Sequence, residues 1–431
     1  MNNGIVIREN PQIGERCYYL KHESGLNIYF IPKNLATSFA VFSTRYGSVD
    51  SRFRYRGEEK FTVVPDGIAH YLEHKMFENE DGVDSFELFA KYGAKANAFT
   101  SFDKTSYLFS STDNFYESLG VLLNLVTHPY FTPETVAKEQ GIIGQEIAMI
   151  ADNAENTLIF GLLGAMYKTH NVRIEIGGSQ ESIAKITAPL LYECYEKFYN
   201  LNNMSLCISG NQDFDKIVEV CDGILKKSEP YNVESECLEE NAEVFEKEFV
   251  KYMDVPMPLF AIGVKDLNIS PDANVRMRRR AAMQILSELL FGSSSKFYNV
   301  CYENGYITDN FDLWSEHNRS FSMITLSAVG ANPDKVFEEY KKYIAENYEN
   351  GISRQDFERC KKMSYADFIR TFDSTSGIAY SIMDFVLDGA DMLDYAETVS
   401  SLTYDEVNSL FRELFREEYT SYAKVLPKNK Q

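Results

Sequence analysis

An acidic stretch at residues 228–247 divides this chain of 431 residues into two halves of similar size. The stretch, SEPYNVESECLEENAEVFEK, has little apolar periodicity, which is typical of a linker between domains. A chain of this length is too long for one ordinary hydrophobic core. We therefore predict an N-terminal domain at 1–227, a linker at 228–247 and a C-terminal domain at 248–431.

Strand-like and helix-like segments are mixed in both halves. In the first half, strand-like alternation at 17–32, 38–49 and 95–112 is interleaved with helical periodicity from residue 68 onward. The second half has a broadly similar order, which suggests an internal duplication, although no residue-level repeat is visible. The predicted fold class is α+β: two similar-sized domains of α/β layers, related by pseudo-duplication and enclosing a clam-like chamber.

The formal net charge of −21 argues against a general nucleic-acid binder and against docking on an anionic membrane surface. The longest apolar runs, such as residues 120–126, are far too short to span a bilayer, and the N-terminal sequence does not resemble a signal peptide. Seven cysteines without a Cys-x-x-Cys pair indicate reduced thiols in the core. These features together favour a cytoplasmic protein that contacts neither nucleic acid nor membrane.

The motif with chemical meaning is His70-x-x-Glu73-His74, which follows a helix-start signal with Asp66 as the expected N-cap. Residues four apart share one helix face, so both imidazoles can reach one metal ion, and zinc is the ion that this ligand type favours. Glu73 borders the same face and can reach a water at the metal. Chance would produce this motif in about one such chain in a hundred, and a solvated helix face is then the alternative.

The motif resembles that of the inverted-zincin peptidases of the pitrilysin/insulinase family, which includes the mitochondrial processing peptidases. The resemblance implies a third ligand in a helix some seventy residues downstream. Here Glu146 lies 72 residues after His74, and Glu139 precedes Glu146 by seven, about two helical turns. The match implies Glu146 as a zinc ligand and Glu139 as a carboxylate that orients a histidine. Without the match, a solvated acidic helix face would be preferred.

The segment Asn97-Ala98-Phe99-Thr100 is similar to the family's edge strand, which receives the substrate as an added strand. The resemblance implies substrate-binding roles for Asn97, Ala98 and Phe99; the strand pattern alone indicates an ordinary core strand. Residues 170–187 are also similar to a family segment, and we expect His170 there to be structural.

The second half matches the family more weakly. Residues 291–307 resemble a segment where an Arg and a Tyr often contact substrate, but Cys301 and Thr308 occupy those places. This departure puts the usual substrate clamp in doubt. The fragments LEHKMFE and NAFTSF are most similar to the short bacterial members of YmfH type.

The resemblance and the motif together predict a zinc-dependent endopeptidase that hydrolyses short or unfolded peptides, with a water activated by the metal and Glu73 as general base. Two alternatives stay open: a zinc-containing subunit that is active only with a paralogous partner, and a non-catalytic peptide-binding module. The expected partners are a peptide substrate and, following the resemblance, a second copy or an inactive paralogue in a dimer.

Overall fold

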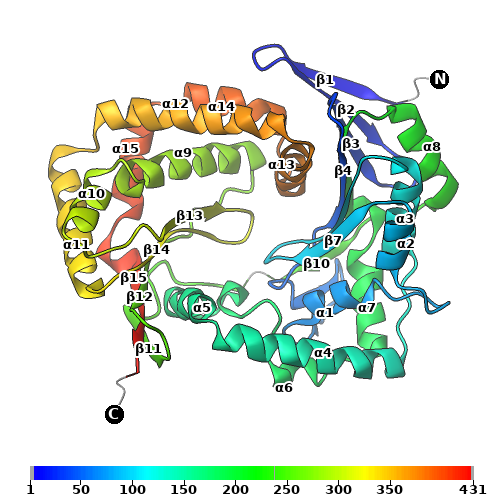
Figure 1. The fold of residues 1–431 in the computed structure, drawn as a ribbon, viewed down its shortest axis with the longest axis horizontal. Coiled ribbons are helices and arrows are strands. Elements are labelled where there is room, and N and C mark those ends of the chain that lie inside the picture. Colours follow the sequence, from blue (N-terminus) through cyan, green and yellow to red (C-terminus); the bar gives the residue numbers. More distant parts are fainter. Residues whose placement is uncertain (1–3, 237, 429–431) are drawn as a thin grey trace. The chain divides into compact units, whose positions relative to one another are not determined.

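The computed structural model describes residues 4–236 and 238–428, which form two compact units (Figure 1). Each unit is built from three separate stretches of the chain. Unit 1 comprises residues 4–147, 175–236 and 369–394, and unit 2 comprises residues 148–174, 238–368 and 395–428. The chain therefore passes between units inside the predicted linker, whose residue 237 lies outside the described ranges. The packing differs from the predicted continuous division because two helical segments belong to the other unit.

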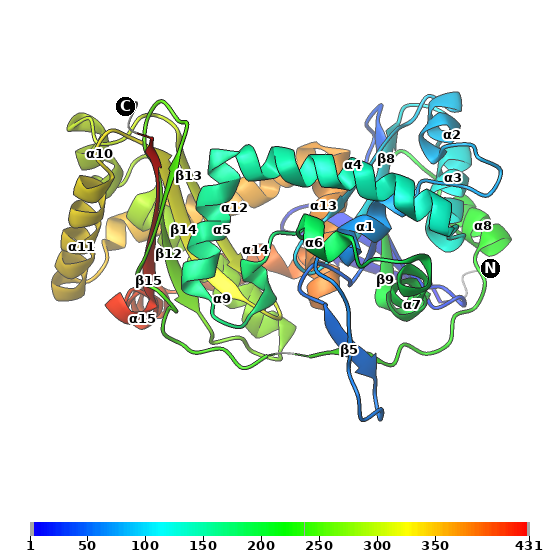
Figure 2. The ribbon, with the colours of Figure 1, turned by 90° about the horizontal axis from the view of Figure 1, so that it is seen from below.

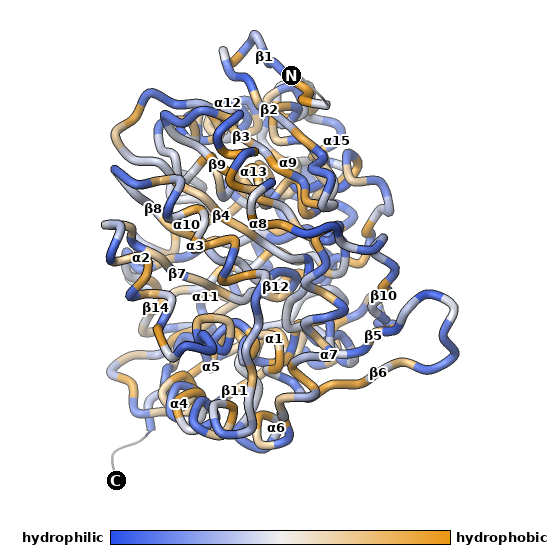
Figure 3. Tube along the Cα trace, turned by 90° about the vertical axis from the view of Figure 1, so that its right-hand side faces the viewer, coloured by the Kyte–Doolittle hydropathy of each residue, from blue (hydrophilic) through white to orange (hydrophobic). Residues whose placement is uncertain are grey.

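Unit 1 contains a seven-stranded sheet in the order β1-β2-β3-β9-β4-β8-β7. Its strands are β1 (Val6–Asn10), β2 (Glu15–Lys21), β3 (Asn27–Pro32), β4 (Ser38–Thr44), β7 (Lys95–Thr100), β8 (Thr105–Ser111) and β9 (Met204–Gly210). A small sheet contains β5 (Arg52–Tyr55), β6 (Thr62–Val63) and β10 (Val233–Ser235). The turn between β5 and β6 projects from the unit (Figure 2) and is mostly hydrophilic (Figure 3).

The helices of unit 1 are α1 (Ile68–Lys75), α2 (Ser85–Lys91), α3 (Phe115–Thr127), most of α4 (Pro133–Asp152), α6 (Gln180–Ile183), α7 (Ala188–Phe198), α8 (Phe214–Ile224) and α13 (Thr375–Asp388). The central strands β4 and β9 are buried along their whole length. Helices cover both faces of the sheet there, with α3 and α8 on one face and α13 on the other (Figure 1). A strand that is buried on both faces needs apolar or small residues on both, as in SFAVFST and MSLCISG.

Unit 2 contains a five-stranded sheet in the order β11-β15-β12-β14-β13. Its strands are β11 (Glu248–Met253), β12 (Leu259–Asp266), β13 (Phe311–His317), β14 (Ser322–Val329) and β15 (Thr420–Pro427). Its helices are α5 (Ala154–Met166), α9 (Ala273–Phe291), α10 (Lys296–Glu303), α11 (Pro333–Asn350), α12 (Arg354–Arg370, as far as residue 368), α14 (Tyr395–Ser401) and α15 (Tyr404–Leu414). The helix α5 packs on one face of the sheet and α11 on the other (Figure 2).

The two sheets share one topology. The strands β3-β9-β4-β8-β7 of unit 1 correspond in order to β11-β15-β12-β14-β13 of unit 2. In each set the first pair is parallel and the other three pairs are antiparallel. Two helices join the third and fifth strands of each set: α1 and α2 in unit 1, α9 and α10 in unit 2. The predicted α+β class with two duplicated domains is confirmed. Two helices pack in the unit formed mainly by the other half of the chain: α5, from the first half, belongs to unit 2, and α13, from the second half, belongs to unit 1.

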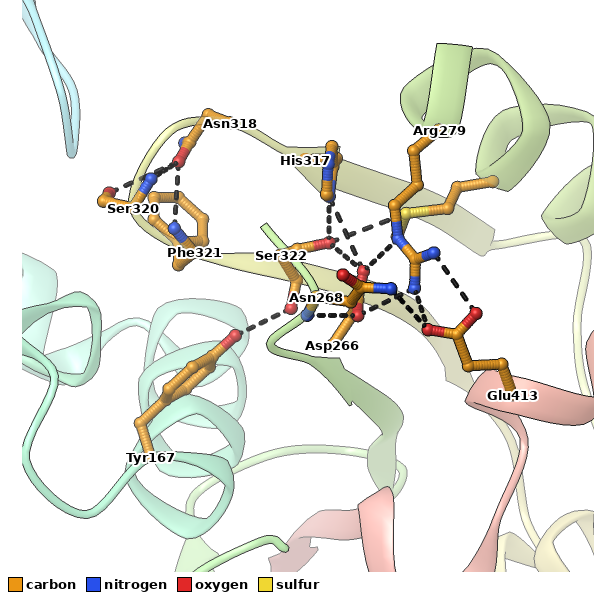
Figure 4. Close-up of polar contacts among 11 residues, drawn as sticks. Tyr167, Asp266, Asn268, Arg279, His317, Asn318, Ser320, Phe321, Ser322 and Glu413 are labelled. Atoms are coloured by element: carbon orange, nitrogen blue, oxygen red, sulfur yellow. Dashed lines mark hydrogen bonds and ion pairs between the residues drawn. The ribbon is translucent and has the colours of Figure 1, made fainter. Parts of the chain in front are cut away.

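A buried polar network joins β12 to the helices of unit 2 (Figure 4). Arg279 of α9 binds both carboxylate oxygens of Asp266, at 2.9 and 3.0 Å, and also contacts Glu413 of α15 at 2.9 Å. Ser322 Oγ donates to Asp266 at 3.0 Å and lies 2.7 Å from His317 Nδ1. Burial acts to raise the pKa of Asp266, but the bonds from His317 and Arg279 outweigh it and hold that pKa well below its usual range. The network compensates an otherwise costly buried charge.

Two further expectations from the sequence concern the cysteines and the lack of a membrane-spanning segment. The six cysteines within the described ranges are buried and unpaired, as expected for core thiols. No helix in those ranges is both long enough and apolar enough to cross a bilayer.

Candidate metal centre

The helix α1 begins in a tight turn that only glycine can form. Gly67 is the N-cap, in the left-handed region at φ 88°, and a Cβ there would lie 2.3 Å from the carbonyl oxygen of Gly177. The prediction of Asp66 as N-cap is therefore wrong: Gly67 is the N-cap, and the Asp66 carbonyl accepts a hydrogen bond from Ser182 Oγ. The close approach of residues 175–178 determines where α1 starts and hence where its histidines point.

The ligand atoms of His70, His74 and Glu146 lie within 4.8 Å of one another. Glu146 Oε1 is 3.7 Å from His70 Nε2, and Glu146 Oε2 is 3.5 Å from His74 Nε2. The two imidazole rings are 4.6 Å apart and steeply inclined to each other. The structure thus brings together three side chains that the sequence places on two separate helices, α1 and α4.

The helix α4 carries both predicted carboxylates. It begins at Pro133, and Thr132 Oγ1 accepts a hydrogen bond from the backbone N–H of Thr135 at 3.2 Å, a cap that typically contributes about 1 kcal/mol. Glu139 is one of the few buried residues of this helix. Its Oε1 atom lies 2.9 Å from His74 Nδ1. The contact places the Nδ1 proton on the side of Glu139 and leaves Nε2 of His74 directed at Glu146.

This arrangement affects the protonation of both histidines. Burial lowers the pKa of His70 to about 4, and the neighbouring His74 acts in the same direction. For His74, burial also acts to lower the pKa, but the hydrogen bond to Glu139 and the nearby Glu73 outweigh it and raise the pKa. His70 is therefore neutral at pH 7 and offers a lone pair to a cation, whereas a cation at His74 Nε2 competes with a proton.

Glu73 lies beside the three ligand candidates without being one of them. Its side chain is only 8% exposed, and its Oε2 accepts a hydrogen bond from Thr100 Oγ1 at 2.7 Å. Burial raises the pKa of Glu73, and the bond from Thr100 partly opposes that effect. A carboxylate that is oriented in this way and has a raised pKa is suited to take up a proton.

The donor set fits zinc. Tetrahedral zinc with bonds of about 2.0–2.1 Å places neighbouring ligand atoms roughly 3.3–3.4 Å apart. The two histidine-to-carboxylate distances of 3.7 and 3.5 Å are near that value. Two imidazole nitrogens and one carboxylate oxygen are also a ligand set that catalytic zinc sites use, with one position left for water or substrate.

The strand β7 forms an edge of its sheet next to this site. Ser101 N–H donates to the carbonyl of Lys104 at 2.8 Å, towards β8. Because N–H groups alternate in direction along a strand, Ala98 directs its N–H away from β8, to the unpaired edge. Asn97 and Ala98 line a pocket of about 760 Å³ that also includes Glu73 and His74.

Phe99 does not line that pocket. Its ring lies 6.1 Å from that of Tyr380 on α13, which gives it a packing role in the structure. Other parts of the pocket wall come from the α1–α2 connection, from α2, and from α4 with the residues just before it, where the sequence did not point to binding residues. These wall residues include Phe77, Phe86, Tyr130, Lys138 and Ile142.

Two contributors to the site were not assigned from the sequence. Thr100, which belongs to the Asn-Ala-x-Thr match, is the hydrogen-bond donor to Glu73, and that match was the available signal. Gly177 packs against His70: a Cβ at Gly177 would lie 3.5 Å from His70 Nδ1. His70 Nδ1 is buried and makes no hydrogen bond within the described residues. Residues 175–178 lie in the segment 170–187 that resembles the family, but the sequence assigned them no role in the site.

The other residues singled out in the sequence belong to unit 2. His170 belongs to unit 2, where its Nδ1 accepts the N–H of Val172 at 3.0 Å, a structural role as expected. Cys301 is fully buried in α10, and Thr308 Oγ1 donates to the carbonyl of Val329 at 3.2 Å. Neither side chain provides the charge or the phenol of the Arg/Tyr clamp.

Comparisons with known proteins agree with this fold. Residues 64–180 match the model of the insulinase family, peptidase family M16, and residues 185–364 match the model described as the peptidase M16 inactive domain. The chain is 38% identical over 427 residues to the uncharacterized zinc protease YmfH of Bacillus subtilis, covering 98% of this chain and 99% of the relative.

Two solved structures have the same fold. A putative M16-like peptidase from Alicyclobacillus acidocaldarius superposes with a TM-score of 0.93 at 33% identity, over 98% of this chain and all of that one. A protease from Helicobacter pylori gives a TM-score of 0.82 at 18% identity, over 96% of this chain and all of that one, which supports the fold alone. The chain belongs to the insulinase family of peptidases, family M16.

Proposed function

We propose that this protein is a zinc-dependent endopeptidase that cleaves short or unfolded peptides. The observation that carries the proposal is the convergence of His70, His74 and Glu146 on one point, with Glu73 buried beside them. The names of relatives as zinc proteases support the same conclusion.

His70, His74 and Glu146 are the residues that would hold the metal. A zinc ion at this place supplies Lewis acidity, which makes water more acidic and polarises a carbonyl group. Glu73 accepts the proton of the attacking water on its carboxylate and returns it to the leaving amine. Thr100 holds one carboxylate oxygen of Glu73, so the other oxygen is the one that exchanges the proton. Glu139 keeps His74 in the tautomer that presents Nε2.

The unpaired edge of β7 suggests how a substrate binds. An extended peptide that adds to this edge pairs its backbone with the N–H and C=O groups at Ala98, close to Glu73. Main-chain pairing needs an extended segment, which short and unfolded peptides supply and compact proteins do not. The proposal therefore includes a preference for unfolded substrates, with side-chain selectivity left to the pocket beside the strand.

The direct test is digestion of a peptide library by the purified, zinc-loaded protein, with cleavage products identified by mass spectrometry. We expect internal cleavage of many peptides and faster digestion of an unfolded protein than of its stable folded form. Equal rates for the folded and unfolded forms would contradict the substrate class, and no cleavage of any peptide would contradict the endopeptidase itself.

Replacing Glu139 by glutamine should weaken zinc affinity or turnover by about 10–100-fold, because the amide holds the His74 imidazole less strongly. Zinc affinity can be measured by competition with a chelator, and turnover with a fluorogenic peptide. Glu134→Gln, on the exposed part of the same helix, is the matched control and should behave as wild type. Unchanged zinc affinity together with unchanged turnover in Glu139→Gln would show that Glu139 does not orient His74 for metal binding.

Replacing Ala98 by proline should weaken peptide binding by about 3–10-fold, since the N–H at the free edge of β7 is lost while pairing with β8 is kept. The Michaelis constant of a short peptide is the relevant measurement, and Ala98→Ser, which retains the N–H, is the control. A folded proline variant with wild-type peptide affinity would show that substrates do not pair with β7.

A second candidate function is a zinc-containing subunit that needs a paralogous partner. The observation that favours it is the absence of the Arg/Tyr clamp, since Cys301 is buried and Thr308 is bonded to the backbone. Peptide turnover by the protein purified alone, compared with turnover by the protein purified with any associated chain, separates the two functions. Activity of the isolated chain at the full rate excludes the partner requirement.

A further inference from the structure

Unit 2 contains a pocket at the place that corresponds to the metal centre of unit 1. The topology matches α9 with α1, β13 with β7 and α12 with α4. A pocket of about 290 Å³ lies among α9, α12 and β13. Its wall contains Arg280 and Gln284, four residues apart on α9, and Cys360 and Asp367, seven apart on α12. These spacings equal those of the histidines on α1 and of the carboxylates on α4.

The pocket cannot reproduce the metal site. A guanidinium at Arg280 and an amide at Gln284 replace imidazoles, and a permanently protonated guanidinium does not ligate a cation. Nevertheless the cavity is not filled by apolar side chains. Gln284, Glu288 and Ser364 are among the polar residues that line it, together with Trp314. A retained cavity with convergent polar groups is typical of a ligand site.

Ser364 is the residue of this pocket that most directly suggests a ligand site. The residue is 5% exposed, and its Oγ is buried without a hydrogen bond within the described part of the chain. The adjacent Tyr395 hydroxyl donates to Gln284 Oε1 at 2.9 Å; burial raises the pKa of this phenol, and the neighbouring Ser364 hydroxyl acts to lower it. A buried hydroxyl that is left unsatisfied costs free energy, which a ligand or an ordered water recovers.

The charges around the pocket favour a cation. Arg280 and Asp367 have opposite charges, and each already has another interaction. Arg359, which also lies near Glu288, is paired with Asp356 at 3.1 Å. Within the described ranges, the half-buried carboxylate of Glu288 is the charge of this pocket that forms no ion pair; burial raises its pKa, although the Arg359 guanidinium acts to lower it. Trp314 is 36% exposed on the edge strand β13, and its indole offers a face to an aliphatic stem or a cation.

We propose that this pocket binds the side chain of arginine or lysine, with the cationic end at Glu288 and Ser364 and the stem against Trp314. The volume of about 290 Å³ suits one group of amino-acid size. The same chemistry is available from a free basic amino acid and from a basic residue within a peptide. The site is separate from the residues proposed for peptide hydrolysis and does not depend on them.

Trp314 makes the test direct, because it is the single tryptophan of the chain. Its fluorescence in the full-length protein should change saturably on addition of arginine or of a blocked tripeptide with a central arginine. The matched ligands are citrulline, which has nearly the same shape without the charge, and the corresponding citrulline tripeptide. Saturation by the free amino acid alone or by the tripeptide alone identifies the source, and either supports the proposal.

Glu288→Gln should weaken arginine binding by about 10–100-fold, because a charge-assisted hydrogen bond is lost. Ser364→Ala should weaken it less, and Glu349→Gln, an exposed substitution on α11, should leave it unchanged. Circular dichroism verifies folding, and calorimetry provides a second measure of affinity.

Glu73→Gln should bind arginine like wild type, so a failed peptidase assay and a failed pocket assay are distinguishable. Equal binding of citrulline and arginine overturns the proposal, as does an unchanged affinity of both Glu288→Gln and Ser364→Ala. Absence of both a fluorescence change and a heat signal with the arginine ligands also overturns it.

Discussion

Replacing Glu73 by glutamine is expected to abolish most peptide hydrolysis while zinc stays bound. Glutamine has the shape of glutamate and can still accept the hydrogen bond from Thr100, but it cannot take up the proton of the attacking water. Loss of a general base typically slows a reaction by about 10²–10⁴-fold. The measurement is kcat on a fluorogenic peptide, with zinc content determined on the same sample.

The control for this substitution is Glu117→Gln, an exposed glutamate on α3 of the same unit. It should retain both zinc and full turnover. If Glu73→Gln cleaves peptides at the wild-type rate, Glu73 is not the base. If it loses zinc together with activity, Glu73 belongs to the metal-binding set instead.

Replacing His74 by alanine is expected to remove zinc from the protein and to reduce hydrolysis to background. His74 contributes one of only two imidazole nitrogens and is also the side chain that Glu139 orients. The two remaining ligand candidates, His70 and Glu146, leave the site below the three protein ligands of a catalytic zinc centre. We expect about one zinc per chain in the wild type and little in the variant, measured by atomic spectroscopy after dialysis.

His128→Ala is the matched control, because this exposed histidine follows α3 in the same unit and has no role in the site. Its zinc content and activity should equal those of the wild type. Equal zinc content in His74→Ala and wild type would refute the ligand assignment, whatever happens to activity.

The ligand pattern was predictable from the sequence because it depends on helix periodicity. Two histidines four apart and two glutamates seven apart lie on single faces of α1 and α4 whatever the rest of the fold does. The resemblance to the family then connected the two helices, which spacing alone could not do. In the structure Glu139 lies against His74 Nδ1, and Glu146 faces the Nε2 atoms of both histidines.

The residues that cap the N-termini of helices could be predicted only in part. The cap of α4 forms locally at Thr132, since its side chain and the helix N-terminus are adjacent in sequence. The expected cap before α1 did not form at Asp66, because the approach of Gly177 requires a glycine conformation at residue 67. A contact between residues more than a hundred positions apart thus overrode a local preference.

What the sequence by itself determined are the features that local spacing encodes: the α+β composition, two histidines on one face of α1, two glutamates on one face of α4, and a strand at 95–100. Only the tertiary structure decided which hydroxyl orients Glu73, that α5 packs in unit 2 and α13 in unit 1, and that unit 2 has a polar pocket where unit 1 has its candidate metal centre. The physical reason is that each of these depends on contacts between distant segments. Such contacts are selected by the burial of whole helix and sheet faces, which no short sequence pattern specifies.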